Sequence, residues 1–191
     1  MHTSRVRIGV TGHRVLTDVG PVVKSVRAAV QRIQCAWPGC LLTVVSALAA
    51  GADQMVVDEV LATSDACLVV VLPFASDEYA RDFDDGSRER EHFFALLEQA
   101  SDVYVVPAVG TRGRAYLRAG EHIVDQCDVL LAVWDGQSEH GEGGTAQIVK
   151  RARRLAKPLV IVQAGNRRHG TVEPTTLGHE QGRIIVERLP G

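Results

Sequence analysis

Three short segments of the sequence combine small residues with polar or charged side chains that are suited to binding an anion. They read GVTGHRVL from Gly9, SALAAGADQ from Ser46, and WDGQSEHGEGGTAQ from Trp134. Each segment follows an apolar run and precedes a helical pattern of apolar residues. Glycine lets a ligand approach the backbone closely, and the N-terminus of a helix offers N–H groups and positive potential. The three segments therefore predict loops that hold a phosphate group.

Some residues of these segments are expected to bind a ligand through their backbone and others through their side chains. The expected ligand-binding residues are Thr11, Gly12, His13 and Arg14 in the first segment, Ala50, Gly51, Ala52 and Asp53 in the second, and Asp135, Gly136, Gly143, Gly144 and Thr145 in the third. Arg14 can pair with a phosphate through two hydrogen bonds, and His13 can bind phosphate or transfer a proton. Asp135 and Glu142 are acceptors suited to ribose hydroxyls.

Each segment also has a purely structural interpretation. The first could be a tight turn that carries polar surface residues. In the second, the small residues could serve only to let a helix pack closely on a strand, with Asp53 as the N-cap of that helix. The third could be a flexible surface turn with a glycine near a helix N-cap.

Short apolar runs alternate with helical patterns along most of the chain, and this alternation predicts the elements that position the three segments. The predicted strands cover residues 6–10, 41–47, 67–72, 103–106, 129–133 and 159–162, and residues 183–189 could add an edge strand. Most runs are rich in Val, Ile or Leu without alternation, as expected of strands buried on both faces. The pattern predicts an α/β fold, a doubly wound, mostly parallel Rossmann-like sheet with helices on both faces. We expect one domain over residues 1–191, with a core of about residues 5–163 and a C-terminal extension over 164–191.

Two segments interrupt this alternation. Residues 73–90 contain Tyr79, Phe83 and a dense set of charged residues, and residues 107–120 contain three arginines. Both segments follow the end of a predicted strand. Ligands of doubly wound sheets bind outside the carboxyl ends of the strands, so both segments could flank a site, and residues 73–90 could close over a ligand.

The composition is that of an ordinary soluble protein. The chain is 46% hydrophobic and 23% charged, with a formal net charge of −2. Its end, from Lys150, carries nine Lys or Arg against three Glu, which a solvated helix face and tail explain more simply than phosphate binding. No apolar run approaches the roughly 18 residues of a membrane helix, and the four cysteines form no C-x-x-C pair. We expect a cytoplasmic protein that binds no membrane, no metal and no cofactor.

Familiar nucleotide-binding and catalytic motifs are absent or incomplete. Residues 141–146, GEGGTA, match the dinucleotide fingerprint G-x-G-x-x-G/A, but they follow a late strand, and the next strand is followed by no acidic residue to bind the ribose. The sequence contains no P-loop, no H-E-x-x-H and no G-x-S-x-G nucleophile elbow. A P-loop NTPase is therefore excluded.

The ordered set GVTGHR, SALAAGAD, CDVLLAVWDG and GGTAQIVKRA resembles the SLOG superfamily, which joins the DNA-processing protein DprA to the cytokinin-activating LOG phosphoribohydrolases. The resemblance covers roughly residues 5–163. It implies a Rossmann-like fold, a nucleotide or nucleotide-derived ligand and, often, a homodimer.

The sequence departs from the LOG pattern at the catalytic position. LOG enzymes resemble one another in a P-G-G-x-G-T-x-x-E motif whose final Glu is catalytic. Aligned on Gly144 and Thr145, that position is Ile148 here, and no Pro-Gly-Gly precedes it. An isoleucine can neither stabilise a cationic sugar nor activate water, whereas Glu142 or Glu121 could take the place of the missing carboxylate in space.

These observations support several hypotheses about function. The first is a sensor-like protein that binds a nucleotide or a nucleotide-derived ligand without turning it over. The alternative is a LOG-like phosphoribohydrolase acting on nucleoside 5′-monophosphates. A DprA-like single-strand binder that uses the basic C-terminal segment is disfavoured, because aromatic content is only 5% and stacking platforms are scarce. A scaffolding domain with empty glycine loops is a further alternative.

Overall fold

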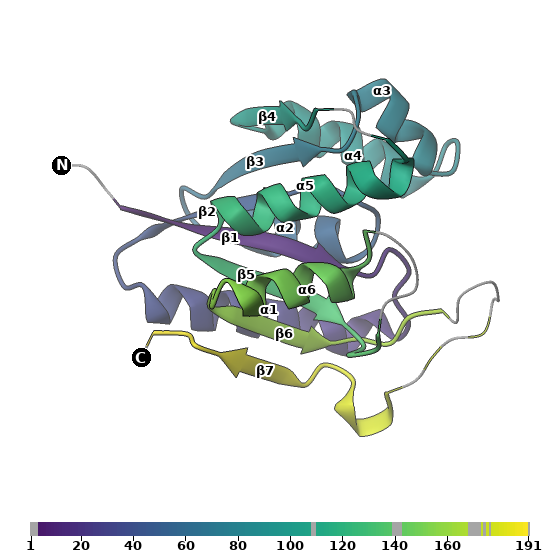
Figure 1. The fold of residues 1–191 in the computed structure, drawn as a ribbon. Coiled ribbons are helices and arrows are strands. Elements are labelled where there is room, and N and C mark those ends of the chain that lie inside the picture. Colours follow the sequence, from purple (N-terminus) through teal and green to yellow (C-terminus); the bar gives the residue numbers. More distant parts are fainter. Residues whose placement is uncertain are drawn as a thin grey trace.

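The computed structural model describes residues 4–107, 110–138, 143–167, 173, 175 and 177–190, which form a sheet between two layers of helices (Figure 1). The seven strands lie in the order β4-β3-β2-β1-β5-β6-β7. Their bounds are β1 (Arg5–Gly12), β2 (Leu41–Ser46), β3 (Cys67–Leu72), β4 (Asp102–Val105), β5 (Val129–Trp134), β6 (Leu159–Gln163) and β7 (Ile184–Glu187). Strands β1 to β6 pair in parallel, and β7 pairs antiparallel with β6. This confirms the predicted fold class, and the predicted edge strand is β7.

Helices cover both faces of the sheet. On one face lie α1 (Val19–Ala36), α2 (Ala52–Leu61) and α4 (Arg88–Gln99), and on the other lie α5 (Arg112–Gln126) and α6 (Thr145–Arg154), which are in front of the sheet in Figure 1. Three short elements complete the described structure: α3 (Ser76–Tyr79) and the 3₁₀ turns Ala80–Asp82 and Gly178–Glu180. Over the described residues, the helices all fall short of the length and apolarity that crossing a membrane requires.

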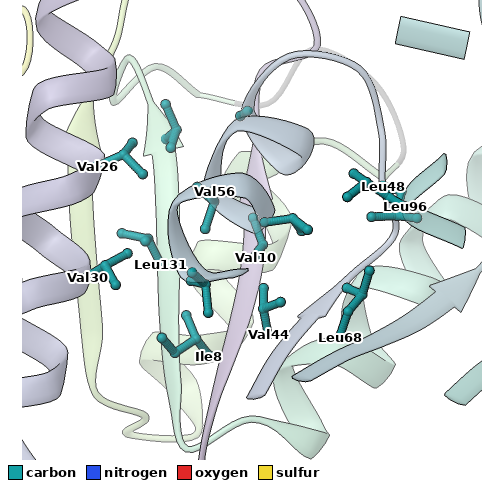
Figure 2. Close-up of a cluster of buried hydrophobic side chains, with 14 of the residues drawn as sticks. Ile8, Val10, Val26, Val30, Val44, Leu48, Val56, Leu68, Leu96 and Leu131 are labelled. Carbon is teal, nitrogen blue, oxygen red and sulfur yellow. The ribbon is translucent and has the colours of Figure 1, made fainter. Parts of the chain in front are cut away.

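Burial on both faces explains the continuous apolar runs of the central strands. All six residues of β5 are buried: alternate residues such as Leu131 join the core beneath α1 and α2, and the residues between them, such as Leu130, join the core beneath α5 and α6. In Figure 2, Val26 and Val30 of α1 point toward Ile8 and Leu131 of the sheet. Because successive side chains of a strand point to opposite faces, a strand covered twice has no polar side to alternate.

The centre of the sheet is the point at which strand order reverses. The chain leaves β1 through α1 to reach β2 on one side, while β5 pairs with β1 on the other side. At the carboxyl ends of this pair, Gly12 lies beside Val133 in the β1–β5 register. Ligands of doubly wound sheets bind in the crevice at such a switch point.

The segment 107–120, which interrupted the sequence pattern, belongs largely to a helix that the sequence analysis did not predict. Helix α5 begins after the N-cap Thr111, whose hydroxyl accepts a hydrogen bond from the Arg114 N–H. It buries Ala115, Ala119 and Ile123, which lie at helical spacing. The two alanines gave a weak apolar signal because small residues bury little surface, yet they let the helix approach the sheet closely.

The structure also defines how the segment 73–90, α2 and α6 begin. Within residues 73–90 the chain forms α3 and a 3₁₀ turn before α4 begins at Arg88. The proposed N-cap role of Asp53 is wrong, because α2 begins at Ala52 after the N-cap Gly51. Gly51 has a φ of +77°, and the Asp53 side chain turns back to Ser46. The helical pattern expected after the third segment is α6, and Thr145 is its first residue.

Candidate functional site

A cavity of about 540 Å³ lies at the carboxyl ends of the central strands. It is bordered by residues from every loop that follows β1, β2 and β3, and by the start of α6. The described lining residues are Val10, Thr11, Gly12, Arg14, Ala47, Ala49, Asp53, Pro73, Tyr79, Tyr116, Ala119, Gly120, Ile123, Gly143, Gly144, Thr145 and Ile148. The fold thus brings together parts of all three glycine-containing segments, which lie far apart in the sequence.

Gly12 forms the narrowest point between these segments. A Cβ atom at this position would lie 2.4 Å from Cβ of Ala52 and 2.7 Å from the carbonyl oxygen of Val133. The backbone N–H of Ala52 donates to the carbonyl of His13 at 3.0 Å, and the N–H of His13 donates to the carbonyl of Val133 at 3.1 Å. Only a residue without a side chain allows β1, β5 and α2 to meet here.

Some small residues of the second segment pack against other parts of the backbone, and others line a cavity. Ala52 is fully buried against Gly12 and does not border the central cavity. A Cβ atom at Gly51 would meet the Arg14 carbonyl oxygen at 2.3 Å. Ala50 and Gly51 border a neighbouring cavity on the far side of Arg14. The structural interpretation of these small residues, close packing of a helix on a strand, describes Gly51 and Ala52 well.

Arg14 extends between the two cavities that it borders. Its guanidinium lies 3.5 Å from a carboxylate oxygen of Asp82 and 5.1 Å from the ring centre of Tyr116. Burial lowers the pKa of Arg14, but the nearby Tyr79, Asp82 and Tyr116 more than offset this, and the pKa is raised overall. The guanidinium is therefore a permanent positive charge at the rim, half-exposed and available to an anion.

Asp53 is the carboxyl group among the described residues that border the central cavity. Its side chain is 5% exposed and accepts a hydrogen bond of 3.0 Å from the Ser46 hydroxyl. Burial raises its pKa to about 6, against the opposing effects of the hydrogen bond from Ser46, of backbone N–H groups and of Arg14. A carboxyl with such a pKa exchanges a proton near neutral pH, at the border of the central cavity.

The loop before α6 contributes mainly backbone to the cavity. Gly143 has a φ of +85° and packs so closely on α5 that a Cβ atom would lie 2.9 Å from Cβ of Tyr116. Its N–H donates to the side-chain oxygen of Gln147 at 2.7 Å. Gly144 is the N-cap of α6 and Thr145 its first residue, so the positive end of this helix adjoins the cavity.

His13 and Asp135 lie at a different place from the central cavity, although both were expected at the ligand. Nε2 of His13 is 3.1 Å from Oδ1 of Asp135, and Nδ1 is 3.1 Å from the side-chain nitrogen of Asn166. The backbone nitrogen of Asp135 also lies 3.1 Å from Nε2, so the ring contacts both the backbone and the carboxylate of this residue. Burial acts to raise the pKa of Asp135, but the hydrogen bond to His13 and backbone N–H groups lower it overall. The pair ties β1 to the ends of β5 and β6.

Gly136 borders a separate cavity of about 800 Å³ beside α6. The other residues lining it are Trp134, Gln137, Ser138, Ala146, Lys150, Arg153 and Arg154. Arg153 also pairs with Glu187 of β7 at 2.7 Å. The third segment is therefore split between two cavities on opposite sides of the α6 N-terminus.

The structure shows the position of only one of the two carboxylates that could replace the LOG glutamate. Glu121 does not border the central cavity; it lies 3.4 Å from Arg151 of α6. Glu142 lies outside the described residues. Ile148 does border the cavity, is 2% exposed and packs against Gly120. The position that carries Glu in the LOG pattern thus faces the cavity here with an apolar side chain.

Residues of the two segments that could flank a site, 73–90 and 107–120, form a cluster of aromatic and charged side chains at the cavity rim, although the sequence analysis did not name Asp82 or Tyr116. Arg112 lies 4.3 Å from the ring centre of Phe74 and bonds Asp82 at 2.6 Å, and the Tyr116 hydroxyl also donates to Asp82. Tyr79 is buried against Tyr116, with ring centres 6.4 Å apart. Helical spacing of Ala115, Ala119 and Ile123 was the available signal, because it places Tyr116 on the flank of a helix that faces the strand ends.

Comparisons with known proteins identify the fold and no family. No protein-family model and no curated protein sequence matches the chain. Among solved structures, the chain is similar to DNA processing protein A (DprA) from Streptococcus pneumoniae, with a TM-score of 0.50 and 18% identity. The match covers 81% of this chain and 49% of the DprA chain, so the chain spans about half the length of that protein. What the comparisons establish is a DprA-like, Rossmann-like fold.

Proposed function

We propose that the chain binds a nucleotide or a nucleotide-derived ligand in the central cavity, without a catalytic carboxylate at the position of Ile148. The observation that carries this proposal is the meeting of Gly12, Arg14 and the N-terminus of α6 around one cavity. Its volume of about 540 Å³ lies in the range of about 300–1,000 Å³ that is usual for small-molecule sites.

The phosphate is expected at the side of the cavity formed by Gly144, Thr145 and Arg14. The first four N–H groups of a helix have no partner within the helix, and its dipole favours an anion. Arg14 adds a permanent charge across from them, and the hydroxyl of Thr145 adds a further hydrogen-bonding group. The ring of Tyr116 and the side chains of Ile123 and Ile148 line the apolar remainder, which suits a sugar or base.

The proposal is tested by thermal unfolding of the chain with a panel of nucleotides, together with mass spectrometry of small molecules released from the purified protein. A ligand at about 100 times its Kd stabilises the native state by about 2.7 kcal/mol, which raises Tm by roughly 5–10 °C in a chain of this size. We expect a shift with at least one nucleotide, and no release of free base.

Matched arginine variants locate the binding. Arg14→Gln should abolish the ligand-induced shift, whereas Arg27→Gln should preserve it, because Arg27 is on the surface of α1, paired with Glu59 at 2.9 Å. If no nucleotide changes Tm, or if both variants respond alike, the proposed site is wrong.

One observation favours a second candidate, a phosphoribohydrolase. Asp53 borders the cavity with a pKa of about 6, which suits a general acid or base. This candidate requires free base to appear when nucleoside 5′-monophosphates are incubated with the chain, and Asp53→Asn to stop its release while binding persists. Intact monophosphates after long incubation would exclude it.

Another observation favours single-stranded DNA binding, and the structural neighbour is named for DNA processing. Lys150, Arg153 and Arg154 line one cavity together with the indole of Trp134. Proteins that bind single-stranded nucleic acid usually combine positive charges, which contact the phosphates, with aromatic rings, on which the bases stack. Oligonucleotide affinity would then fall steeply with salt and be lost in a Lys150→Gln, Arg154→Gln double variant, but not in Arg14→Gln.

A further inference from the structure

The strand β4 forms an unusually apolar edge of the sheet. Val103, Tyr104 and Val105 are 44%, 41% and 44% exposed, and they follow one another along the outermost strand (Figure 1). The opposite edge, β7, has Arg183 just before its start and Glu187 and Arg188 at its end, and among the described residues it has a single large exposed apolar residue, Val186. Exposed apolar edge strands are templates for pairing with another strand, and proteins usually protect them with charges.

The backbone of β4 is oriented for such pairing. The N–H of Val106 donates to the carbonyl of Leu72 in β3 at 2.9 Å. Because backbone groups of successive residues in a strand point to alternate sides, residues 102, 104 and 106 turn toward β3. Val103 and Val105 therefore direct their N–H and C=O groups to the free edge.

We propose that β4 pairs antiparallel with β4 of a second copy of this chain. In this pairing Val103 lies opposite Val105 of the other copy, and the two Tyr104 residues lie opposite each other at the two-fold axis. Residues that lie directly opposite each other in a sheet have side chains on the same face. Because side chains alternate between faces along a strand, two identical strands related by a two-fold axis perpendicular to the sheet meet this condition only when the residue numbers of each opposite pair sum to an even value. The outward backbone groups of Val103 and Val105 are compatible with this register, which pairs both of them with the other copy.

Charge complementarity supports a second copy as the occupant. Tyr104 stacks on His122 of α5, with ring centres 4.5 Å apart, so residues 102, 104 and 106 share the α5 face of the sheet. Arg118 lies one helical turn before His122, and α5 runs opposite to the strands, so Arg118 is level with Val106.

In the proposed register, Asp102 of the second copy lies opposite Val106 and thus beneath Arg118. Both Asp102 and Arg118 are exposed. The two-fold axis repeats this acid–base pair, so that two ion pairs flank the paired tyrosines. The two sheets would then join into one continuous sheet through the dimer.

The proposal is tested by sedimentation equilibrium of the full chain over a wide concentration range. We expect twice the chain mass of 20.7 kDa. Val105→Lys should reduce the observed mass to that of one chain without loss of the folded state by circular dichroism. The matched control is Val186→Lys, at a residue 39% exposed on the other edge, which should leave the dimer intact.

A charge exchange separates pairing from any effect on folding. Asp102→Arg or Arg118→Asp alone should weaken the dimer by placing like charges together, and the double variant should restore it. A chain that stays monomeric at the highest concentration, or a dimer that is unchanged by Val105→Lys, would overturn the proposal. These results concern oligomeric state alone, so they are independent of nucleotide binding.

Discussion

His13 and Arg14 are neighbours in the sequence, but their side chains lie in two regions with different roles. Arg14 borders the central cavity and contacts Asp82 and the ring of Tyr116. His13 points to Asp135 and Asn166, where it connects the ends of three strands. The turn after a strand therefore separates the roles of two adjacent polar residues: the side chain of Arg14 borders the central cavity, and that of His13 contributes to packing.

The largest effect is expected at Gly12, the residue that both regions share. Gly12→Ala places a Cβ 2.4 Å from Cβ of Ala52 and 2.7 Å from a backbone oxygen, so the backbone must shift. We expect a loss of roughly 3 kcal/mol or more in the free energy of unfolding, at the upper end of what overpacking usually costs, because one of the two contacts is with a backbone atom. Urea unfolding measures it.

Gly20→Ala is the matched control, because a Cβ there meets nothing within 4 Å and the residue lies in the first turn of α1. It should change stability by no more than about 1 kcal/mol, in the stabilising direction. Equal losses in the two variants would show that the close contact at Gly12 does not connect the two regions.

The second effect is a pH dependence of stability caused by Asp53, which borders the central cavity. Because the pKa of Asp53 is raised from 3.8 to about 6, the native state retains a proton that the unfolded chain has lost. The stability contributed by this group is full below pH 4 and falls as pH rises to about 6. Relative to Asp53→Asn, the chain should lose roughly 2–3 kcal/mol over that interval.

Urea unfolding of both proteins at several pH values checks this expectation. The comparison with the variant removes the contributions of all other groups. A stability difference that is constant between pH 4 and 7 would contradict the raised pKa, and with it the second candidate function that depends on this carboxyl.

The smallest expected effect comes from a direct comparison of variants at the adjacent residues His13 and Arg14. His13→Ala removes the contacts with Asp135 and Asn166, and we expect a loss of about 1–2 kcal/mol in stability with ligand affinity nearly unchanged. Arg14→Gln should show the reverse, a large loss of affinity with little change in stability. Calorimetric titration with the ligand identified by the melting screen, combined with urea unfolding, measures both quantities. If His13→Ala also abolishes binding, the division into two regions is wrong.

The sequence predicted the strands better than the loops and one helix. Residues 67–72 form β3 as predicted, because a run of apolar residues buried on both faces has few alternative structures. Helix α5 was missed because its buried face is made partly of alanines. Tyr116 and Asp82 were missed as rim residues for a related reason: one is on that helix, and the other follows a four-residue helix that short patterns do not reveal.

By itself, the sequence determined the alternation of strands and helices, the parallel sheet and the edge at which glycine loops gather, since these follow from local patterns of apolar residues and from chirality. Only the tertiary structure decided which loop residues meet. Gly12, Arg14 and Thr145 share one cavity, while Asp135 and Gly136 turn away from it, because strand register and the close contact at Gly12 set the direction of each side chain. These contacts join residues far apart in the sequence, such as Gly12 with Ala52 and with Val133, and no local pattern specifies them.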